Sequence, residues 1–252
     1  MDGLNIEKRK TLAALLETET QERVMAMIPQ FEEAAIYNLT PMPECVADEL
    51  GILVFNMERG VHLEEIKDFL RDSPDVKPFD VILANELDDG CVRSGGRDTA
   101  REIAEAFGLN YVFGLEFIEL VNEENPKGFH GNAIFSRWPI RRAKVLRLPE
   151  QYNWYFDRQR RIGGRCAVFA ELAVGGRSVG VVSIHLENRT HGEGRQAQMH
   201  AVLQEAERMF PGMPVFLGGD LNTNTFDGRA KEDIGGIAAS AESRRRCLEG
   251  VF

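Results

Sequence analysis

The sequence predicts a layered α/β (α+β) domain with mixed β-sheets, preceded by a helical segment. Two observations lead to this prediction. Between residues 51 and 108, apolar runs of strand length alternate with runs of helical spacing, and from residue 111 onward most apolar runs are extended. The 252 residues, 43% of them hydrophobic, are enough for one substantial domain with an appendage.

Residues 1–50 are expected to form a helical N-terminal extension. The segment 5–37 is rich in Glu, Lys, Arg, Leu, Ala and Met, which favours helix. Its apolar stripe predicts one or two helices and comprises Leu12, Leu15, Leu16, Val24, Met27 and Ile28. Pro41-Met42-Pro43 then marks a linker, and residues 51–252 are expected to form the main domain.

The main domain is expected to begin with alternating strands and helices. Buried strands are predicted over residues 52–55 and 80–84, and helices over 63–70 and 98–107. The first strand ends at Asn56 and the second ends just before Glu86. Gly108 is a suitable stop for the second helix, because glycine readily adopts the left-handed conformation that ends many helices.

The middle of the chain is expected to be rich in strands. Extended runs cover residues 111–120, 132–135, 167–174 and 178–186, and a helix is predicted over 195–210. A last buried strand, 214–217, leads into the motif Gly218-Gly219-Asp220-Leu221-Asn222-Thr223. In this motif the Asp and Asn side chains point to the same side of an extended segment. The pair suits a site that binds a metal, a water and an anionic group, and an Asx-type turn is the alternative.

Polar side chains occur where the predicted buried strands end. They are Asn56, Glu86, His185, Asp220 and Asn222. Each has an ordinary alternative as a turn residue, a solvated carboxylate or a core histidine, but together they predict a common site. Glu86 offers the hard oxygen that Mg²⁺ prefers, and His185 can donate a hydrogen bond to a phosphoryl oxygen or a leaving group. Such groups would neutralise the charge that develops during phosphoryl transfer.

The distribution of charge along the chain limits the classes of molecule that the protein is expected to bind. The formal net charge is −10, and residues 1–50 contribute −6 of it, so the main domain is only mildly acidic. This argues against a broad basic face for nucleic acid phosphates. The run Arg158-Gln159-Arg160-Arg161 with Arg165 is either a local basic pocket or a solvated loop. No apolar run approaches the ~20 residues that a membrane-spanning helix needs.

The cysteines predict an ordinary reducing environment. The four are far apart and form no C-x-x-C pair: Cys45, Cys91, Cys166 and Cys247. Such spacing does not indicate a zinc or redox site. We therefore expect four reduced thiols in a cytoplasmic protein.

Five segments occur in an order that is typical of one enzyme superfamily. They are Asn56, Glu86, Gly131-Asn132-Ala133-Ile134-Phe135-Ser136-Arg137-Trp138-Pro139-Ile140, Ser183-Ile184-His185-Leu186 and Gly219-Asp220-Leu221-Asn222. Over roughly residues 51–224, the chain resembles the endonuclease/exonuclease/phosphatase superfamily, which has the DNase I-like fold. The resemblance implies a four-layer α/β sandwich of two mixed β-sheets with helices outside. It also implies hydrolysis of a phosphoester with Mg²⁺, or with Mn²⁺ in its place.

The resemblance also implies a role for each strand-end residue. Glu86 and Asn56 would bind the metal, and His185 would hydrogen-bond the scissile phosphate. Asp220 and Asn222 would position the nucleophilic water and stabilise the phosphoryl group. The substrate would be a phosphodiester or phosphomonoester in a nucleic acid, a phosphorylated small molecule or a lipid headgroup.

The chain also departs from the superfamily pattern. Asn85 and Ser183 stand where Gln and Thr are usual, and both changes are mild. The superfamily's closing Asp and Ser-Asp-His motifs have no counterpart after Asn222, and no histidine follows His200. We therefore expect a C-terminally incomplete form that lacks the closing strands. The alternative is a catalytically weak or inactive member that binds a ligand or partner. The histidines expected at the surface are His62, His130, His191 and His200.

Overall fold

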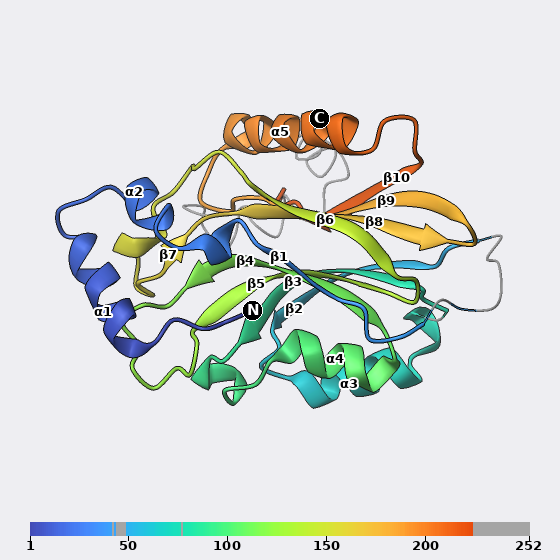
Figure 1. Ribbon diagram of the computed structural model, residues 1–252, viewed down its shortest axis with the longest axis horizontal. Helices are drawn as coiled ribbons and strands as arrows, with labels where there is room; N and C mark the ends of the chain where they lie inside the picture. Colours follow the sequence, from blue (N-terminus) through green and yellow to red (C-terminus); the bar gives the residue numbers. More distant parts are fainter. Residues whose placement is uncertain (42, 44–48, 77, 224–252) are drawn as a thin grey trace, which may run out of the picture.

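The computed structural model describes residues 1–41, 43, 49–76 and 78–223. Two β-sheets pack face to face and helices cover their outer faces (Figure 1). Both sheets are mixed, as the sequence predicts, because each has parallel and antiparallel neighbours. Residue 42 of the expected linker, and the segment expected to lack closing strands, lie outside the described residues.

The first sheet has the strand order β1-β4-β5-β3-β2, and β7 also pairs with β4. Its strands are β1 (Ala34–Tyr37), β2 (Ile52–Arg59), β3 (Val81–Asp89), β4 (Asn110–Ile118), β5 (Phe129–Ser136) and β7 (Ile162–Gly163). β2 runs parallel to β3, and the other pairs are antiparallel.

The second sheet has the order β10-β9-β8-β6. Its strands are β6 (Ile140–Arg147), β8 (Cys166–Val174), β9 (Arg177–His185) and β10 (Val215–Asp220). β10 runs parallel to β9, so both strands end at the same edge of the sheet.

The central core lies between the two sheets. Val81 and Leu83 of β3 pack there with Val168 of β8 and Val181 of β9. The alternate residue Ile82 belongs to the cluster on the other face of the first sheet. Because β3 is buried on both faces, its sequence is a continuous apolar run without polar alternation.

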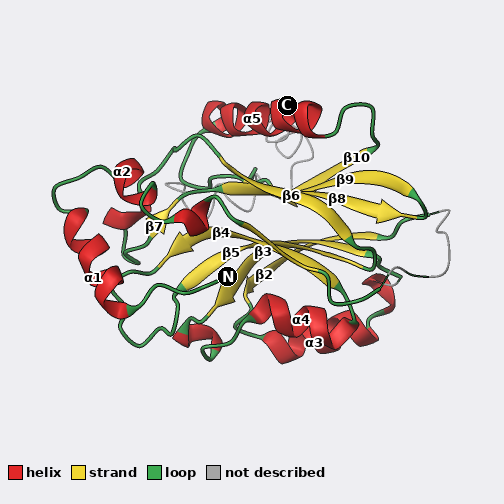
Figure 2. Cartoon of the chain, in the orientation of Figure 1, coloured by secondary structure: helices red, strands yellow, loops and turns green. Residues whose placement is uncertain are grey.

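Three helices cover the outer faces of the sheets (Figure 2). α3 (Leu63–Asp72) and α4 (Thr99–Phe107) lie on the first sheet, and α5 (Gly192–Met209) lies on the second. The α4 helix begins at Asp98, whose carboxylate accepts a hydrogen bond from the Arg101 N–H at 2.9 Å. It ends at Gly108, which has a φ of 61°, as the sequence predicts.

The N-terminal segment forms helices and also one strand. α1 (Ile6–Leu15) and α2 (Gln21–Met25) confirm the expected helices. Arg9, only 2% exposed, fixes α1 to the loop after β4, because its guanidinium donates to the Asn125 carbonyl at 2.7 Å. β1 was not predicted, and it is an edge strand of the first sheet. The division of the chain at residue 50 stays a prediction.

Two other strands escape the sequence patterns. β6 carries arginines and a lysine, and only Ile140 and Val145 of its residues are buried, so it lacks a long apolar run. β7 has two residues. Short 3-10 helices connect the elements at η1 (Pro29–Phe31), η2 (Pro74–Val76), η3 (Val92–Ser94) and η4 (Trp154–Phe156).

Two of the four cysteines can be placed. Cys91 and Cys166 are buried free thiols, whereas Cys45 and Cys247 lie outside the described residues. In the described part of the chain, no helix is both long and apolar enough to cross a membrane. The cytoplasmic location stays a prediction.

Candidate active site

The structure brings the five strand-end residues together at one end of the two sheets. Asn56 Nδ2 donates to Asp220 Oδ2 at 3.0 Å, which connects β2 with β10. His185 Nε2 lies 4.0 Å from Asp220 Oδ2 and 3.9 Å from Glu86 Oε1. Asn222 donates its backbone N–H to Asp220 Oδ1 at 3.0 Å. We call these five residues the strand-end cluster, and their catalytic roles stay predictions.

Two residues of the cluster lie at local irregularities of the backbone. The pairing of β2 with β3 shifts register after Asn56, and the pairing of β3 with β5 shifts between Ala84 and Leu87. Glu86 lies in the second shift and has a φ of 56°, which is uncommon for a residue other than glycine. Bulges of this kind re-aim side chains and often lie beside functional sites.

Asn85 connects the two sheets beneath the cluster. Its Oδ1 accepts from the Asp220 N–H at 2.8 Å, and its Nδ2 donates to the Ile184 carbonyl at 3.1 Å and to Asn132 Oδ1 at 3.2 Å. The side chain is fully buried. Asn85 therefore fixes the position of Asp220 on the second sheet relative to Glu86 on the first.

His185 is held from behind by two buried charges. Its Nδ1 lies 3.1 Å from Glu116 Oε2, where an N–H can donate to the carboxylate. Arg165 Nη1 lies 3.0 Å from Nδ1 and 2.8 Å from Nε2, against the imidazole ring. Burial alone would raise the pKa of Glu116, but the charges of His185 and Arg165 outweigh burial and hold the pKa well below its usual value.

The buried network continues away from the cluster. His130 Nε2 lies 3.7 Å from Glu116 Oε2, and His130 Nδ1 lies 2.9 Å from Asp88 Oδ1. Arg93 donates to both oxygens of Asp88 at 2.7 Å. Burial raises the pKa of Asp88, but the hydrogen bonds from His130 and Arg93 outweigh it and lower the pKa to about 2. The prediction that His130 lies at the surface is wrong, because the residue is 2% exposed and paired on both sides.

The basic run divides into a buried and an exposed part. Arg165 is 5% exposed, and its Nε lies 3.4 Å from Glu187 Oε2. Arg161 is also buried, between the rings of Phe117 and Trp154 at 4.1 and 4.2 Å from their centroids. The remaining arginines of the run, Arg158 and Arg160, are exposed. The interpretation as a solvated loop therefore applies to Arg158 and Arg160, and the interpretation as a local basic group applies to Arg161 and Arg165.

Sequence reasoning missed Glu116 altogether. It lies in the middle of β4, whose nine residues are all buried, and it is fully buried itself. The available signal was a single carboxylate in an otherwise apolar strand, since buried charges need a partner. The same reasoning applies to His130 at the start of β5.

The oxygen donors of the cluster fit a magnesium ion that keeps most of its water. Burial raises the pKa of Glu86, but the charges of His130 and His185 outweigh it, so the pKa is lowered and the carboxylate is ionised. Asn56 and Asp220 supply further oxygen atoms nearby. Mg²⁺ is usually bound through one or two carboxylates with several waters. In the residues that the structure describes, no group of three or more His, Cys, Asp or Glu side chains is arranged to hold a metal.

The two mixed sheets, packed face to face with helices outside, define a layered α/β sandwich with polar side chains at its strand ends. Residues 53–235 match the Endonuclease/Exonuclease/phosphatase family, so more than half of the chain is covered. The chain belongs to this family, whose members are hydrolases that act on phosphoester bonds. A comparison with curated proteins gives no significant match.

Several solved structures have a similar fold. An endonuclease/exonuclease/phosphatase from Beutenbergia cavernae is 23% identical, with a TM-score of 0.51, over 68% of this chain and 47% of that protein. A family protein from Leptotrichia buccalis is 15% identical, with a TM-score of 0.51, over 80% and 74%. Sphingomyelinase C from Streptomyces griseocarneus is 15% identical, with a TM-score of 0.50, over 81% and 70%. The chain thus spans about half the length of the first of these proteins.

Proposed function

We propose that this chain hydrolyses a phosphodiester or a phosphomonoester with Mg²⁺, or Mn²⁺, as the cofactor. The observation that supports this most is the convergence of Glu86, His185 and Asp220 beside the buried guanidinium of Arg165. These groups come from four different strands or loops. Two carboxylates, an imidazole and a cation in one place suit a reaction in which negative charge develops on phosphoryl oxygens.

We propose a different role in the reaction for each of these residues, according to its position. Glu86 and Asn56 would hold the metal ion, which when bound supplies positive charge to the phosphoryl oxygens. His185 Nε2, which lies 3.9 Å from Glu86 Oε1 and 4.0 Å from Asp220 Oδ2, would hydrogen-bond the scissile phosphate. Asp220, with Asn222 hydrogen-bonded to it, would position the water that attacks phosphorus.

The substrate class stays open among three chemistries. The mild acidity of residues 51–252 disfavours a long nucleic acid. A phosphorylated small molecule and a lipid headgroup each need only a local site for one phosphate group. The Streptomyces relative is a sphingomyelinase, and that activity is its own.

The test measures hydrolysis of two chromogenic esters by the purified chain. We expect bis(p-nitrophenyl) phosphate or p-nitrophenyl phosphate to release nitrophenolate with Mg²⁺ and not with EDTA. Glu86→Gln should lower the rate at least about 100-fold, because it removes the ionised metal ligand. Glu124→Gln removes an exposed carboxylate elsewhere and should leave the rate unchanged. Equal rates for Glu86→Gln and the wild type would overturn the proposal.

A second candidate function is the binding of a phosphorylated ligand without turnover. One contact favours it: Arg59 Nε lies 3.8 Å from Glu86 Oε2, on the carboxylate that would hold the metal. Calorimetric titration with inorganic phosphate separates the two candidates. Saturable phosphate binding without hydrolysis of either ester would favour the binding protein.

A further inference from the structure

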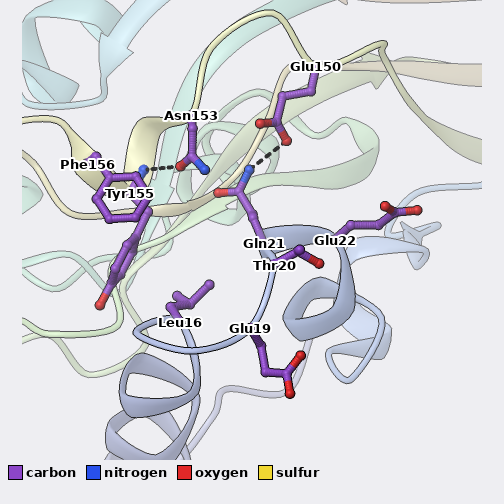
Figure 3. A pocket seen from close by; sticks show the side chains of 9 residues that line it. All are labelled: Leu16, Glu19, Thr20, Gln21, Glu22, Glu150, Asn153, Tyr155 and Phe156. Atoms are coloured by element: carbon purple, nitrogen blue, oxygen red, sulfur yellow. Dashed lines mark hydrogen bonds between the residues drawn. The ribbon is translucent and has the colours of Figure 1, made fainter.

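The N-terminal helices and the segment after β6 enclose a pocket of about 330 Å³ (Figure 3). One wall is the turn between α1 and α2, and the other is formed by Glu150, Asn153 and η4. None of the residues that line the pocket belongs to the strand-end cluster. The family resemblance does not cover the α1–α2 wall, because the matched region begins at residue 53.

The pocket combines carboxylates with aromatic rings. Glu19, Glu22 and Glu150 line it, and Glu19 pairs with Arg23 at 2.5 Å. Within the described part of the chain, Glu22 and Glu150 have no ion-pair partner, and both are exposed. The lining contains no lysine or arginine. The pocket therefore has an uncompensated negative charge.

The aromatic wall is formed by two consecutive residues of η4. The rings of Tyr155 and Phe156 contact edge to face, with centroids 5.5 Å apart. Phe156 is 77% exposed, which is unusual for a large apolar side chain. Aromatic faces attract organic cations as well as apolar groups.

Gln21 supplies an unused hydrogen-bond acceptor inside the pocket. The side chain is 6% exposed, and its Nε2 donates to Glu150 Oε2 at 2.9 Å. In the described residues its Oε1 is buried and has no hydrogen-bond partner. Figure 3 shows this oxygen turned away from Glu150, toward the side of the pocket where Asn153 and Tyr155 lie. A buried acceptor without a donor is costly, so a ligand that donates here would be stabilised.

We propose that this pocket binds a protonated organic amine. The ammonium group would donate to Gln21 Oε1 and be attracted by the charges of Glu22 and Glu150, which line the same pocket, while its hydrocarbon part would contact Tyr155 and Phe156. Anions are disfavoured by the two unpaired carboxylates. A neutral alcohol would satisfy Gln21 but gain nothing from the carboxylates, and a metal ion would gain nothing from the rings.

The test compares benzylamine with benzyl alcohol, its neutral counterpart of nearly the same shape. Each is titrated into the purified full chain, and binding is followed by calorimetry and by the NMR shifts of the protein. We expect saturable binding of benzylamine that is at least about tenfold tighter than that of benzyl alcohol. The reason is that the ammonium charge is attracted by two carboxylates that have no ion-pair partner in the described residues, whereas the alcohol is uncharged. Equal affinity for the two compounds, or no binding of benzylamine, would overturn the proposal.

Two variants locate the binding in this pocket. Glu150→Gln should weaken benzylamine binding at least about fivefold, and Phe156→Ala should weaken it as well, because both groups would contact the ligand. Both side chains are exposed, so neither change should affect folding. Glu124→Gln, which removes the same charge from a distant loop, should have no effect. An equal loss in Glu124→Gln and Glu150→Gln would mean that only the net charge matters, and would refute the site.

Discussion

The inner and outer halves of the candidate active site differ in burial and in how their charges are satisfied. In the inner half, Glu116, His185 and Arg165 are 0%, 1% and 5% exposed, and each lies within hydrogen-bond distance of the other two. In the outer half, the side chains of Glu86 and Asp220 are 23% and 31% exposed, and the nitrogen atoms of Arg59 and His185 lie 3.8 to 4.0 Å from their oxygens. The inner half is a fixed framework, whereas the outer half is open to water and ligands.

Because of this difference, removing a charge should have different consequences in the two halves. A buried ion pair that loses one partner leaves an uncompensated charge in a region from which water is excluded. When a partly exposed carboxylate loses its charge, water solvates the neighbouring groups, and the free energy of unfolding changes little. Stability should therefore depend on the inner half, and ligand binding on the outer half.

The largest expected effect is that of Glu116→Gln. The change removes one of the two buried carboxylates beside Arg165, the other being Glu187, and it also removes the carboxylate beside His185. We expect the free energy of unfolding to fall by about 3–5 kcal/mol. Urea denaturation followed by circular dichroism measures it. The control, Glu124→Gln, should change stability by less than about 0.5 kcal/mol. A loss below about 1 kcal/mol for Glu116→Gln would mean that the inner half is not a charged framework.

An intermediate effect is expected from pH at the far end of the inner network. The pKa of Asp88 is about 2 in the folded chain and 3.8 ordinarily. Since the folded value is the lower one, Asp88 stabilises the fold above about pH 4, and this contribution is lost as the pH falls toward 2. The free energy involved is about 2 kcal/mol. Glu116, whose pKa is also lowered, should add to the loss in the same direction.

Urea denaturation at several pH values between 5 and 2 checks this dependence. Asp88→Asn should be less stable than the wild type at pH 5, and its stability should fall less steeply below pH 4. Parallel curves for the two proteins would contradict the assignment of the pH effect to Asp88.

The outer half of the site was predictable from the sequence, and the inner half only in part: His185 was predicted and Arg165 was one of two alternatives, but Glu116 was missed. Asn56, Glu86 and Asp220 follow apolar runs, and the ends of parallel strands meet at one edge of a sheet. Glu116 and His130 lie within strands, where a single polar residue also fits a strand with one solvated face. Only the tertiary pairing of β4 with β5, and the second sheet above them, makes these positions interior.

The fold shows the same division. Continuous apolar runs such as β3 and β8 were predicted because both of their faces are buried. β1 and β6 were not predicted. β1 has four residues, and β6 carries charged side chains that pair with residues from other elements, as Lys144 does with Glu205 of α5 at 3.1 Å.

The smallest expected effect, and the sharpest test of the comparison, uses two asparagines that face each other in the sheet. Asn56 of β2 and Asn85 of β3 are register partners, but Asn56 is exposed and Asn85 is fully buried. Asn56→Ala removes an exposed hydrogen bond to Asp220, and should lower the free energy of unfolding by less than about 1 kcal/mol. Asn85→Ala leaves the buried Ile184 carbonyl and the Asp220 N–H without this partner, and should cost about 1–3 kcal/mol. Parallel urea denaturation of both variants should show the larger loss for Asn85→Ala if burial decides the outcome. Equal losses would show that burial does not decide the outcome. The exposed hydrogen bond from Asn56 to Asp220 would then stabilise the fold as much as the buried hydrogen bonds of Asn85.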